Sequence, residues 1–420
     1  MITKSRESLL KSNFCVRPFI SMYIEVDGSF RFCCVDQSKS YEKLPSHYKI
    51  SNTNPIDIFN NKQYQLIRTK LIADMIPETC IKCFHSNIQS ELVSGPRIPV
   101  SNRKVEKIKQ YSTIMNIKTM NFIELWFENK CNLKCRMCSP YYTNQLIEEW
   151  SGMINSNNFM KKNYVKFDDQ NYNWTEKEES WNNIFSLIRE IFQDNHDHTL
   201  TLLMAGGEPI LIDGMYRLLD FCIQNNLAKN IILSYKTNFT VLPSKLLKLW
   251  SHFKEVQLSI SVDGYDKTFE YIRYPAKWQK LLQNLDLIKN IENIREVRIH
   301  QTIQAYSILT ITDLLKWCIE SSVDFDRLTD PLLDPNILNV RILPKELKDI
   351  AAEKLLNFYD DNHTHDLIKN RKTEFTWLAK YLYTEDWSHL FDDFIKFTKH
   401  IDKTRNQNII DIMPEIEKYL

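Results

Sequence analysis

The sequence lacks several features that would assign it to a particular class of protein. It contains no run of about 18 apolar residues, and its first 15 residues lack the apolar core of a signal peptide. Its 54 basic and 53 acidic residues leave a formal net charge of +1, so no charge excess favours nucleic acid or a membrane surface. We therefore expect a cytoplasmic protein with no nucleic-acid partner and no membrane contact.

Glycine is also scarce, with seven residues in 420, so the places where glycines cluster are informative. Apolar residues make up 43% of the chain and charged residues 25%, which is ordinary for a globular protein of two or three domains. Most of the ten cysteines precede residue 140 in spaced sets. In a reducing cytoplasm such spacing indicates metal or cluster ligation more than disulfides.

Three of these cysteines, Cys131, Cys135 and Cys138, form a CxxxCxxC loop directly after an apolar stretch that ends at Phe127. Thiolates are the usual ligands of iron–sulfur clusters, and a four-iron cubane with three protein thiolates keeps one iron open for an outside ligand. The alternatives are a three-thiolate zinc site or three unrelated buried cysteines. Structural zinc sites usually have four ligands, in paired CxxC or CxxC with HxxxH arrangements.

At this loop the chain resembles the radical S-adenosylmethionine (radical SAM) superfamily, whose members use this spacing. They usually place an apolar or aromatic residue before the last cysteine, here Met137. The resemblance implies a 4Fe–4S cluster on Cys131, Cys135 and Cys138, with SAM on the open iron and its reductive cleavage to a 5′-deoxyadenosyl radical. It also implies an external electron donor such as flavodoxin or ferredoxin.

Between residues 118 and 345, short β-type runs alternate with helical segments, which is typical of a parallel sheet. The candidate strands are 122–127, 199–204, 230–235, 256–262, 297–303 and 338–343. Six strands agree with the partial (β/α)6 TIM-type barrel of the superfamily. We predict an α/β fold with a barrel at 118–345, a small hairpin-plus-helix domain at 14–90 and a C-terminal helical cap at 346–420. The insertion at 139–198 is expected to carry helices near 143–153 and 180–192.

After the second predicted strand comes a Gly-Gly-Glu-Pro run with Gly206, Gly207 and Glu208. Glycines allow close approach of the backbone to a ligand, and a carboxylate beside them can accept hydrogen bonds from an ammonium group. The resemblance implies that this run holds the methionine amino group of SAM. A turn before a helix is the alternative.

Polar residues follow the next two predicted strands, namely Asn238 and Ser261, with Arg273 further on. Catalytic groups in barrels belong at the carboxyl ends of strands. The resemblance implies that Asn238 and Ser261 contact SAM and that Arg273 pairs with its carboxylate. Strand-end capping is the alternative for Asn238 and Ser261, and a surface charge is the alternative for Arg273.

A second cysteine pattern precedes the barrel. It consists of Cys15, Gly28, Cys33, Cys80 and Cys83, with an Asp-Gly hairpin and a predicted helix at 56–72 between them. The pattern resembles the twitch domain, a short relative of the SPASM domain, which implies an auxiliary 4Fe–4S cluster with four thiolates. Because Cys34 lies beside Cys33, either of the two could be the ligand from this part of the chain. A zinc site with the same cysteines is the alternative to the cluster. Twitch domains usually follow the barrel, so this order resembles an N-terminal-twitch branch.

The remaining candidates are predicted to be structural. Cys222 and Cys318 lie on apolar helix patterns and are expected in the core. His363 and His365 are expected at the surface. Residues on or beside the barrel strands are expected to pack or to form hydrogen bonds, namely Lys236, His300, Gln304 and Tyr306.

We therefore expect a radical SAM enzyme that abstracts hydrogen from a small-molecule or peptide substrate, for a net oxidation aided by the auxiliary cluster. One alternative is a peptide maturase or an epimerase. We expect no leader-peptide-binding domain before Cys15, which slightly disfavours a peptide. An alternative of another class is a non-catalytic iron–sulfur or zinc-binding protein.

Overall fold

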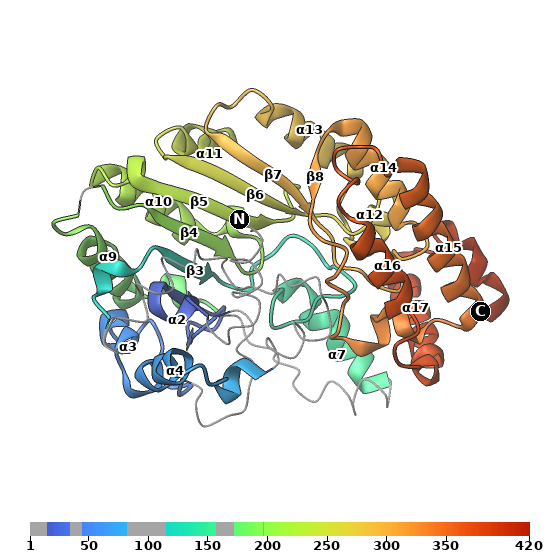
Figure 1. The fold of residues 1–420 in the computed structure, drawn as a ribbon, viewed down its shortest axis with the longest axis horizontal. Helices are drawn as coiled ribbons and strands as arrows, with labels where there is room; N and C mark the ends of the chain where they lie inside the picture. Colours follow the sequence, from blue (N-terminus) through green and yellow to red (C-terminus); the bar gives the residue numbers. More distant parts are fainter. Residues whose placement is uncertain (1–14, 34–43, 82–114, 157–171, 196) are drawn as a thin grey trace, which may run out of the picture. The chain divides into compact units, whose positions relative to one another are not determined.

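The computed structural model describes residues 15–33, 44–81, 115–156, 172–195 and 197–420 (Figure 1). The chain divides into two compact units. The first comprises Met1–Asn129, Asn171–Tyr235 and Pro243–Gln257, and the second comprises Lys130–Gln170, Lys236–Leu242 and Leu258–Leu420. The three-domain division predicted from the sequence stays a prediction. Among the described residues, no helix is long and apolar enough to cross a membrane.

Eight strands of the described chain form one sheet, in the order β2-β1-β3-β4-β5-β6-β7-β8. The strands are β1 (Ser21–Ile24), β2 (Phe30–Arg31), β3 (Phe122–Trp126), β4 (Leu200–Ala205), β5 (Ile231–Thr237), β6 (Glu255–Ser261), β7 (Ile294–His300) and β8 (Asp324–Phe325). The pairs β1–β3, β3–β4, β4–β5 and β7–β8 are parallel, whereas β1 and β2 form an antiparallel hairpin. Strands β3 to β8 alternate with helices, which confirms the predicted α/β partial barrel.

The sixth strand is not the one predicted from the sequence. The run 338–343 is buried and alternates apolar residues with Asn339 and Arg341, but Val340–Ile342 forms a 3-10 turn. The Asn339 side chain accepts a hydrogen bond from the N–H of Arg341, and this local bond favours a turn over a strand ladder. The sixth strand is β8, where Asp324 pairs with Arg298 of β7.

The predicted N-terminal hairpin is present, and its first strand extends the sheet of the barrel. Tyr23 of β1 lies opposite Glu124 of β3 in parallel register. In the turn, Gly28 has φ +78° and donates its N–H to the carbonyl of Glu25 at 2.8 Å. Glycine adopts this conformation at no steric cost, so the Asp-Gly dipeptide predicts the turn correctly.

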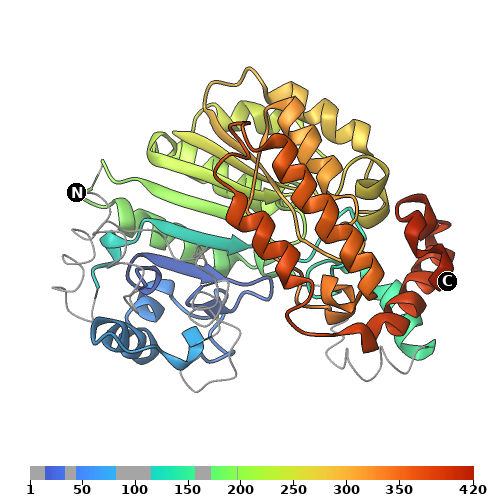
Figure 2. The same ribbon diagram turned by 45° about the vertical axis from the view of Figure 1, so that its right-hand side comes forward.

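Short helices accompany the hairpin in the first unit. They are α2 (Arg17–Ile20), α3 (Pro55–Phe59) and α4 (Lys62–Ile72). The single helix predicted at 56–72 is therefore two, because the side chain of Asn61 caps α4 by accepting a hydrogen bond from the N–H of Tyr64. In Figures 1 and 2 these helices gather beside β1 and β3.

Longer helices follow the strands of the barrel. They are α7 (Ile147–Ser156), α9 (Glu178–Phe192), α10 (Asp213–Gln224), α11 (Ser244–Trp250), α12 (Lys267–Ile272), α13 (Trp278–Ile288) and α14 (Ile311–Ser321). Helix α9 shows why they form, since Trp181, Ile184 and Ile188 recur at helical spacing and are buried. Helices α7 and α9 confirm the helices predicted near 143–153 and 180–192.

The C-terminal region is helical, as predicted. Its helices are α15 (Lys345–Asn362), α16 (Lys372–Tyr381) and α17 (Phe391–Arg405). Figure 2 shows them in orange to red, and α15 and α16 pack on each other. All three belong to the second unit, as does the cysteine loop.

Candidate functional site

The loop of Cys131, Cys135 and Cys138 is irregular backbone held by hydrogen bonds to the segment after α12. The N–H of Lys134 donates to the carbonyl of Tyr274 at 2.6 Å, and that of Arg136 donates to the carbonyl of Ile272 at 2.9 Å. Cys135 is buried, and Cys131 and Cys138 are half-buried. The conformation of the loop is therefore fixed in part by backbone hydrogen bonds to Ile272 and Tyr274.

Polar donors surround the sulfur atoms of this loop. The Leu133 N–H lies 3.5 Å from Cys131 Sγ, the Asn238 amide nitrogen lies 3.9 Å from the same sulfur, and Arg273 Nη1 lies 3.8 Å from Cys135 Sγ. Hydrogen bonds to ligating sulfurs tune the potential of an iron–sulfur cluster. These donors are placed where negative charge would lie if the thiols of Cys131 and Cys135 became thiolates.

Burial raises the pKa of the Cys135 thiol, and it raises the pKa of the Cys138 thiol to about 12, while Arg273 lowers both. Iron binds thiolates, so cluster assembly must displace these protons. In the described residues no three His, Cys, Asp or Glu side chains converge on a single metal position. In a cubane each thiolate binds a different iron, and the three-thiol donor set fits such a cluster.

Asn238, predicted to contact SAM, joins the cysteine loop to the end of β5. Its Nδ2 donates to Asn132 Oδ1 at 3.0 Å, and its Oδ1 accepts from the N–H of Thr240 at 2.9 Å and from Thr240 Oγ1 at 2.6 Å. Asn132 in turn donates to Thr240 Oγ1 at 2.9 Å. These contacts show Asn238 as a capping and positioning residue, and its contact with SAM stays a prediction.

Arg273, predicted to pair with the SAM carboxylate, is buried beside a carboxylate of the chain itself. Its Nε lies 2.8 Å from Oδ2 of the buried Asp263, whose Oδ1 accepts from the N–H of Thr302 at 2.8 Å. Burial lowers the pKa of Arg273, but Asp263 and Cys135 raise it further, so the net direction is upward. The surface-charge alternative is wrong. The partner Asp263 was missed, although it follows the predicted fourth strand directly.

The remaining predicted residue of the second unit is Ser261, the last residue of β6, which is half-buried. Tyr306 and Gln304 are buried, and the Tyr306 hydroxyl lies 2.8 Å from Thr398 Oγ1, which confirms their structural role. Cys318 is buried on α14, as predicted. His363 is exposed and its Nδ1 lies 2.6 Å from the carbonyl of Asp360.

In the first unit, the Gly-Gly-Glu run follows β4 directly. Gly206 has φ +119°, and the N–H of Gly207 donates to the carbonyl of Glu128 at 2.9 Å. Glu208 is buried, and its carboxylate accepts from the N–H of Ile210 at 3.3 Å, at the start of a short 3-10 turn. The run is thus a tight turn that presents a buried carboxylate at the carboxyl end of a strand, where a ligand ammonium could bind.

Replacing Gly206 by alanine is expected to lower the free energy of unfolding by about 1–3 kcal/mol, because a non-glycine residue is strained there. The new Cβ would also lie 3.0 Å from the Phe127 nitrogen and from the Glu128 carbonyl oxygen. Urea denaturation measures the change. Gly152→Ala is the control, since its Cβ meets no described atom within 4 Å and should add about 0.5–1 kcal/mol in helix α7. Equal effects of both substitutions would contradict the conclusion that the backbone at Gly206 requires glycine.

The predicted auxiliary ligands lie in the same unit. Cys15 precedes α2, Cys33 follows β2, and Cys80 ends the 3-10 turn Glu78–Cys80; all three are half-buried. Cys83 and Cys34 lie outside the described residues, so the choice between Cys33 and Cys34 stays a prediction. Cys222 of α10 is buried, as predicted for a core cysteine.

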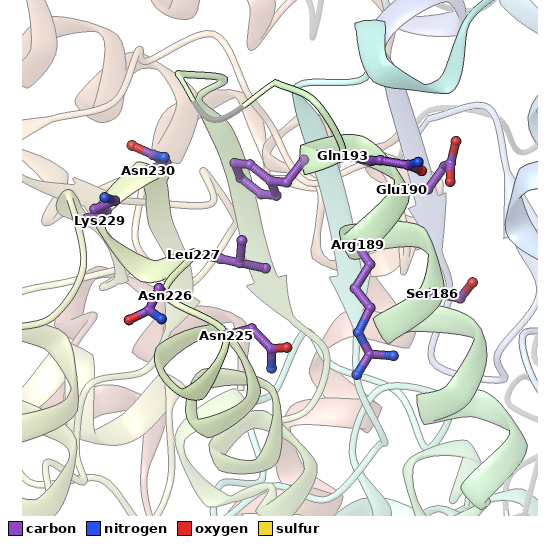
Figure 3. A pocket seen from close by; sticks show the side chains of 10 residues that line it. Ser186, Arg189, Glu190, Gln193, Asn225, Asn226, Leu227, Lys229 and Asn230 are labelled. Carbon is purple, nitrogen blue, oxygen red and sulfur yellow. The ribbon is translucent and has the colours of Figure 1, made fainter.

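A pocket of about 590 Å³ opens elsewhere in the first unit (Figure 3). Arg189 of α9 and Gln193, which directly follows α9, line one side, and Asn225, Leu227 and Lys229 of the turn before β5 line the other. These residues lie at the amino ends of β4 and β5. In barrels the chemistry is placed at the carboxyl ends of the strands, so this pocket is not the candidate site.

Two regions of the chain match protein families, and each region contains one of the two cysteine patterns. Residues 127–303 match the model of the radical SAM superfamily, and residues 15–84 match that of the SPASM iron–sulfur cluster-binding domain. No curated protein matches the chain.

Several solved structures are similar to part of the chain. anSMEcpe with bound AdoMet is 16% identical, with a TM-score of 0.41 over 59% of this chain and 62% of that chain. anSMEcpe with bound AdoMet and Cp18Cys peptide is 18% identical, with a TM-score of 0.41 over 60% and 62%. Streptococcus suis SuiB bound to precursor peptide SuiA is 16% identical, with a TM-score of 0.33 over 63% and 51%. The chain thus spans between 51% and 62% of the length of these structures.

Proposed function

We propose that this protein is a radical SAM enzyme that performs a net oxidation of its substrate, because residues 127–303 match the radical SAM superfamily and residues 15–84 match the SPASM iron–sulfur cluster-binding domain. Its cofactors are a 4Fe–4S cluster, SAM and a further cluster in the N-terminal domain. Bound together, the first cluster and SAM supply a 5′-deoxyadenosyl radical that removes a hydrogen atom from the substrate. We propose that Cys15, Cys33, Cys80 and Cys83 would hold the further cluster as a 4Fe–4S cluster, which would supply an acceptor for the electron that a net oxidation releases.

The observation that carries this proposal is the cysteine loop, with hydrogen-bond donors close to the sulfur atoms of Cys131 and Cys135. Cys131, Cys135 and Cys138 hold the first cluster, and the N–H of Leu133 and the Arg273 guanidinium stabilise negative charge on the sulfurs. A donor set of three thiolates would leave one iron of such a cluster available for SAM. A purely structural cluster would need no such open position.

The chain's own residues then bind and orient SAM. We assign this role to Gly206, Gly207, Glu208, Asn238, Ser261 and Arg273. The buried Glu208 carboxylate accepts hydrogen bonds from the SAM ammonium group, and the two glycines allow close approach of the backbone. Positioning of this kind supplies much of the rate enhancement that a protein adds to a reactive cofactor.

The substrate is a small molecule or a peptide, and the electron for SAM cleavage comes from an external donor such as flavodoxin or ferredoxin. The mass of the product tests the reaction. A net oxidation gives a product lighter by two hydrogens, whereas an epimerase gives a product of unchanged mass with one solvent-derived hydrogen. If no 5′-deoxyadenosine forms with SAM and dithionite, the protein is a binding protein and the proposal is wrong.

Replacing Cys15 or Cys80 by alanine is expected to lower the iron content from about eight to about four atoms per chain, since each 4Fe–4S cluster is lost as a unit. 5′-Deoxyadenosine should still form, because the first cluster has its own ligands. Anaerobic iron analysis and chromatography of the reaction mixture measure both quantities.

Cys222→Ala is the matched control, because Cys222 is also a cysteine of the first unit but is buried in α10. It should retain about eight irons per chain. If Cys15→Ala retains them as well, Cys15 is not a ligand. If the N-terminal domain instead holds zinc, the zinc-site alternative holds and the auxiliary cluster must be abandoned.

A further inference from the structure

The pocket of about 590 Å³ in the first unit takes no part in the proposed chemistry. It lies at the amino ends of β4 and β5, whereas the Gly-Gly-Glu run follows the carboxyl end of β4. Strand β4 has six residues and is therefore about 20 Å long. A volume of this size is typical of small-molecule sites, so the pocket is a candidate for a ligand other than SAM or the substrate.

The pocket lies at the end of the interface between α9 and α10. At the start of α9, Glu178 Oε1 lies 2.6 Å from Arg217 Nη2 of α10. Further along the interface, the rings of Phe185 and Phe221 stack with their centroids 3.9 Å apart. Arg189 follows Phe185 by four residues, and residues at this spacing lie on the same face of a helix. Arg189 thus continues this row of α9 residues to the pocket that it lines.

Two arginines of this interface lie over aromatic rings, but only one of them has a carboxylate partner among the described residues. Arg217 Cζ lies 5.6 Å from the centre of the Phe185 ring, and the side chain pairs with Glu178. Arg189 Cζ lies 5.0 Å from the centre of the Phe221 ring, and within the described ranges its guanidinium has no ion pair or hydrogen bond. A guanidinium that lies over a ring keeps its N–H edge available for a planar carboxylate, which it binds with two hydrogen bonds. A bound carboxylate would thus give Arg189 the partner that Glu178 gives Arg217.

The charges that line the pocket favour an anion. Arg189 and Lys229 line it from opposite sides, and Glu190 is the one acidic residue of the described lining. Lys229, like Arg189, forms no ion pair in the part of the chain that the structure describes. Two cations against one carboxylate leave a positive local charge, which attracts a ligand of negative charge.

The remaining side chains of the lining offer both hydrogen bonds and apolar contact. Asn225 Nδ2 donates to the carbonyl of Phe221 at 2.8 Å, which orients the carboxamide. Figure 3 shows Arg189, Asn225 and Leu227 pointing into the space between α9 and the turn before β5. Phe192, at the end of α9, is 4% exposed and adds apolar surface to the lining. A carboxamide and apolar side chains beside a cation suit a small polar molecule with a carbon skeleton.

We propose that this pocket binds a small organic acid and that the Arg189 guanidinium holds its carboxylate. Lys229 adds positive charge, the Asn225 carboxamide bonds to a polar group of the acid, and Leu227 contacts its carbon skeleton. Binding involves no covalent or redox step. It is independent of the proposed function, because the pocket and the Gly-Gly-Glu run lie at opposite ends of β4.

Isothermal titration calorimetry of the reconstituted full-length protein tests the class of ligand. The probes are succinate and glutarate, with glutaramide as the uncharged counterpart of glutarate and inorganic phosphate as a different anion. At least one of the two acids should bind, and glutaramide should bind about 10-fold more weakly or not at all, because it lacks the charge that Arg189 pairs with. Binding of neither acid, or equally tight binding of glutaramide or phosphate, contradicts the proposal.

Arg189→Met should weaken the binding of the acid about 10–100-fold, which is the usual effect of losing hydrogen bonds to a charged group. Arg189→Lys keeps the charge but loses the planar pair of donors, so its affinity should be intermediate. Arg217→Met is the control, because Arg217 belongs to the same interface but has Glu178 as its partner, and it should bind the acid as the wild type does. Melting temperature and iron content show whether each variant is folded. A folded Arg189→Met variant with wild-type affinity, or an equal loss in Arg217→Met, would overturn the proposal.

Discussion

Replacing Cys135 by alanine is expected to remove about four irons per chain and to abolish the formation of 5′-deoxyadenosine. The remaining two thiolates of the loop cannot hold a cubane with a defined open iron. Cys135 is the buried cysteine of the three, and Arg273 Nη1 lies 3.8 Å from its sulfur. The formation of 5′-deoxyadenosine should fall below detection, because this loop is the proposed site of the cluster that binds SAM. Iron analysis and chromatography measure the two effects.

The control for this variant is Cys318→Ala, which removes a buried cysteine of α14 in the same unit. It should cost about 1 kcal/mol of stability, as small core truncations do, and leave iron content and SAM cleavage unchanged. If Cys135→Ala keeps its iron and still forms 5′-deoxyadenosine, the loop is not the cluster site. Similar losses in both variants would indicate a folding defect.

Replacing Asp402 by alanine is expected to destabilise the second unit by about 3–5 kcal/mol, because it leaves the buried charge of Arg136 without its carboxylate. Arg136 Nη2 donates to Asp402 Oδ1 at 2.5 Å and to Gln407 Oε1 at 2.9 Å, and Nε donates to the carbonyl of Tyr271 at 3.0 Å. The guanidinium also lies 3.6 Å from the centre of the Tyr271 ring. Denaturation with urea measures the loss.

Because Arg136 stands between two cluster ligands, the same variant is expected to bind less iron. The C-terminal helix α17 would thereby act on the cluster loop through this one ion pair. Asp393→Ala on the same helix is the control, since its partner Lys396 is 67% exposed and lies 3.8 Å away, so this pair should contribute about 0–1 kcal/mol. In the double variant Arg136→Met and Asp402→Ala, the losses should be less than additive. Additive losses would show that the two side chains are not coupled.

Local patterns of the sequence predicted much of the fold. Alternating or continuous apolar runs located the first five strands of the barrel, because each is long enough to show its period. Strand β8 has two residues, Asp324 and Phe325, and no pattern of that length can be distinguished from a loop. The buried run at 338–343 looked more like a strand, although Asn339 turns it locally.

The cofactor motifs were also visible, since CxxxCxxC and Gly-Gly-Glu-Pro are contiguous in the chain. The contacts that hold these motifs in place were not visible in the sequence. Arg136 and Asp402 are separated by 266 residues, and each would be taken for a surface charge when read alone. Arg273 and Asp263 meet only when the segment after β6 folds back through α12, and His300 and Asp326 meet only when β7 and β8 align. Pairing of this kind depends on register and burial, which local sequence does not encode.

The measurement that tests the central claim most directly combines anaerobic iron and sulfide analysis of the reconstituted protein with an assay for 5′-deoxyadenosine. About eight irons per chain, together with 5′-deoxyadenosine formed from SAM and dithionite, would establish two 4Fe–4S clusters and radical SAM activity. About four irons per chain with 5′-deoxyadenosine formed would show that the N-terminal cysteines hold no 4Fe–4S cluster. Zinc in place of iron, with no 5′-deoxyadenosine, would contradict the account as a whole.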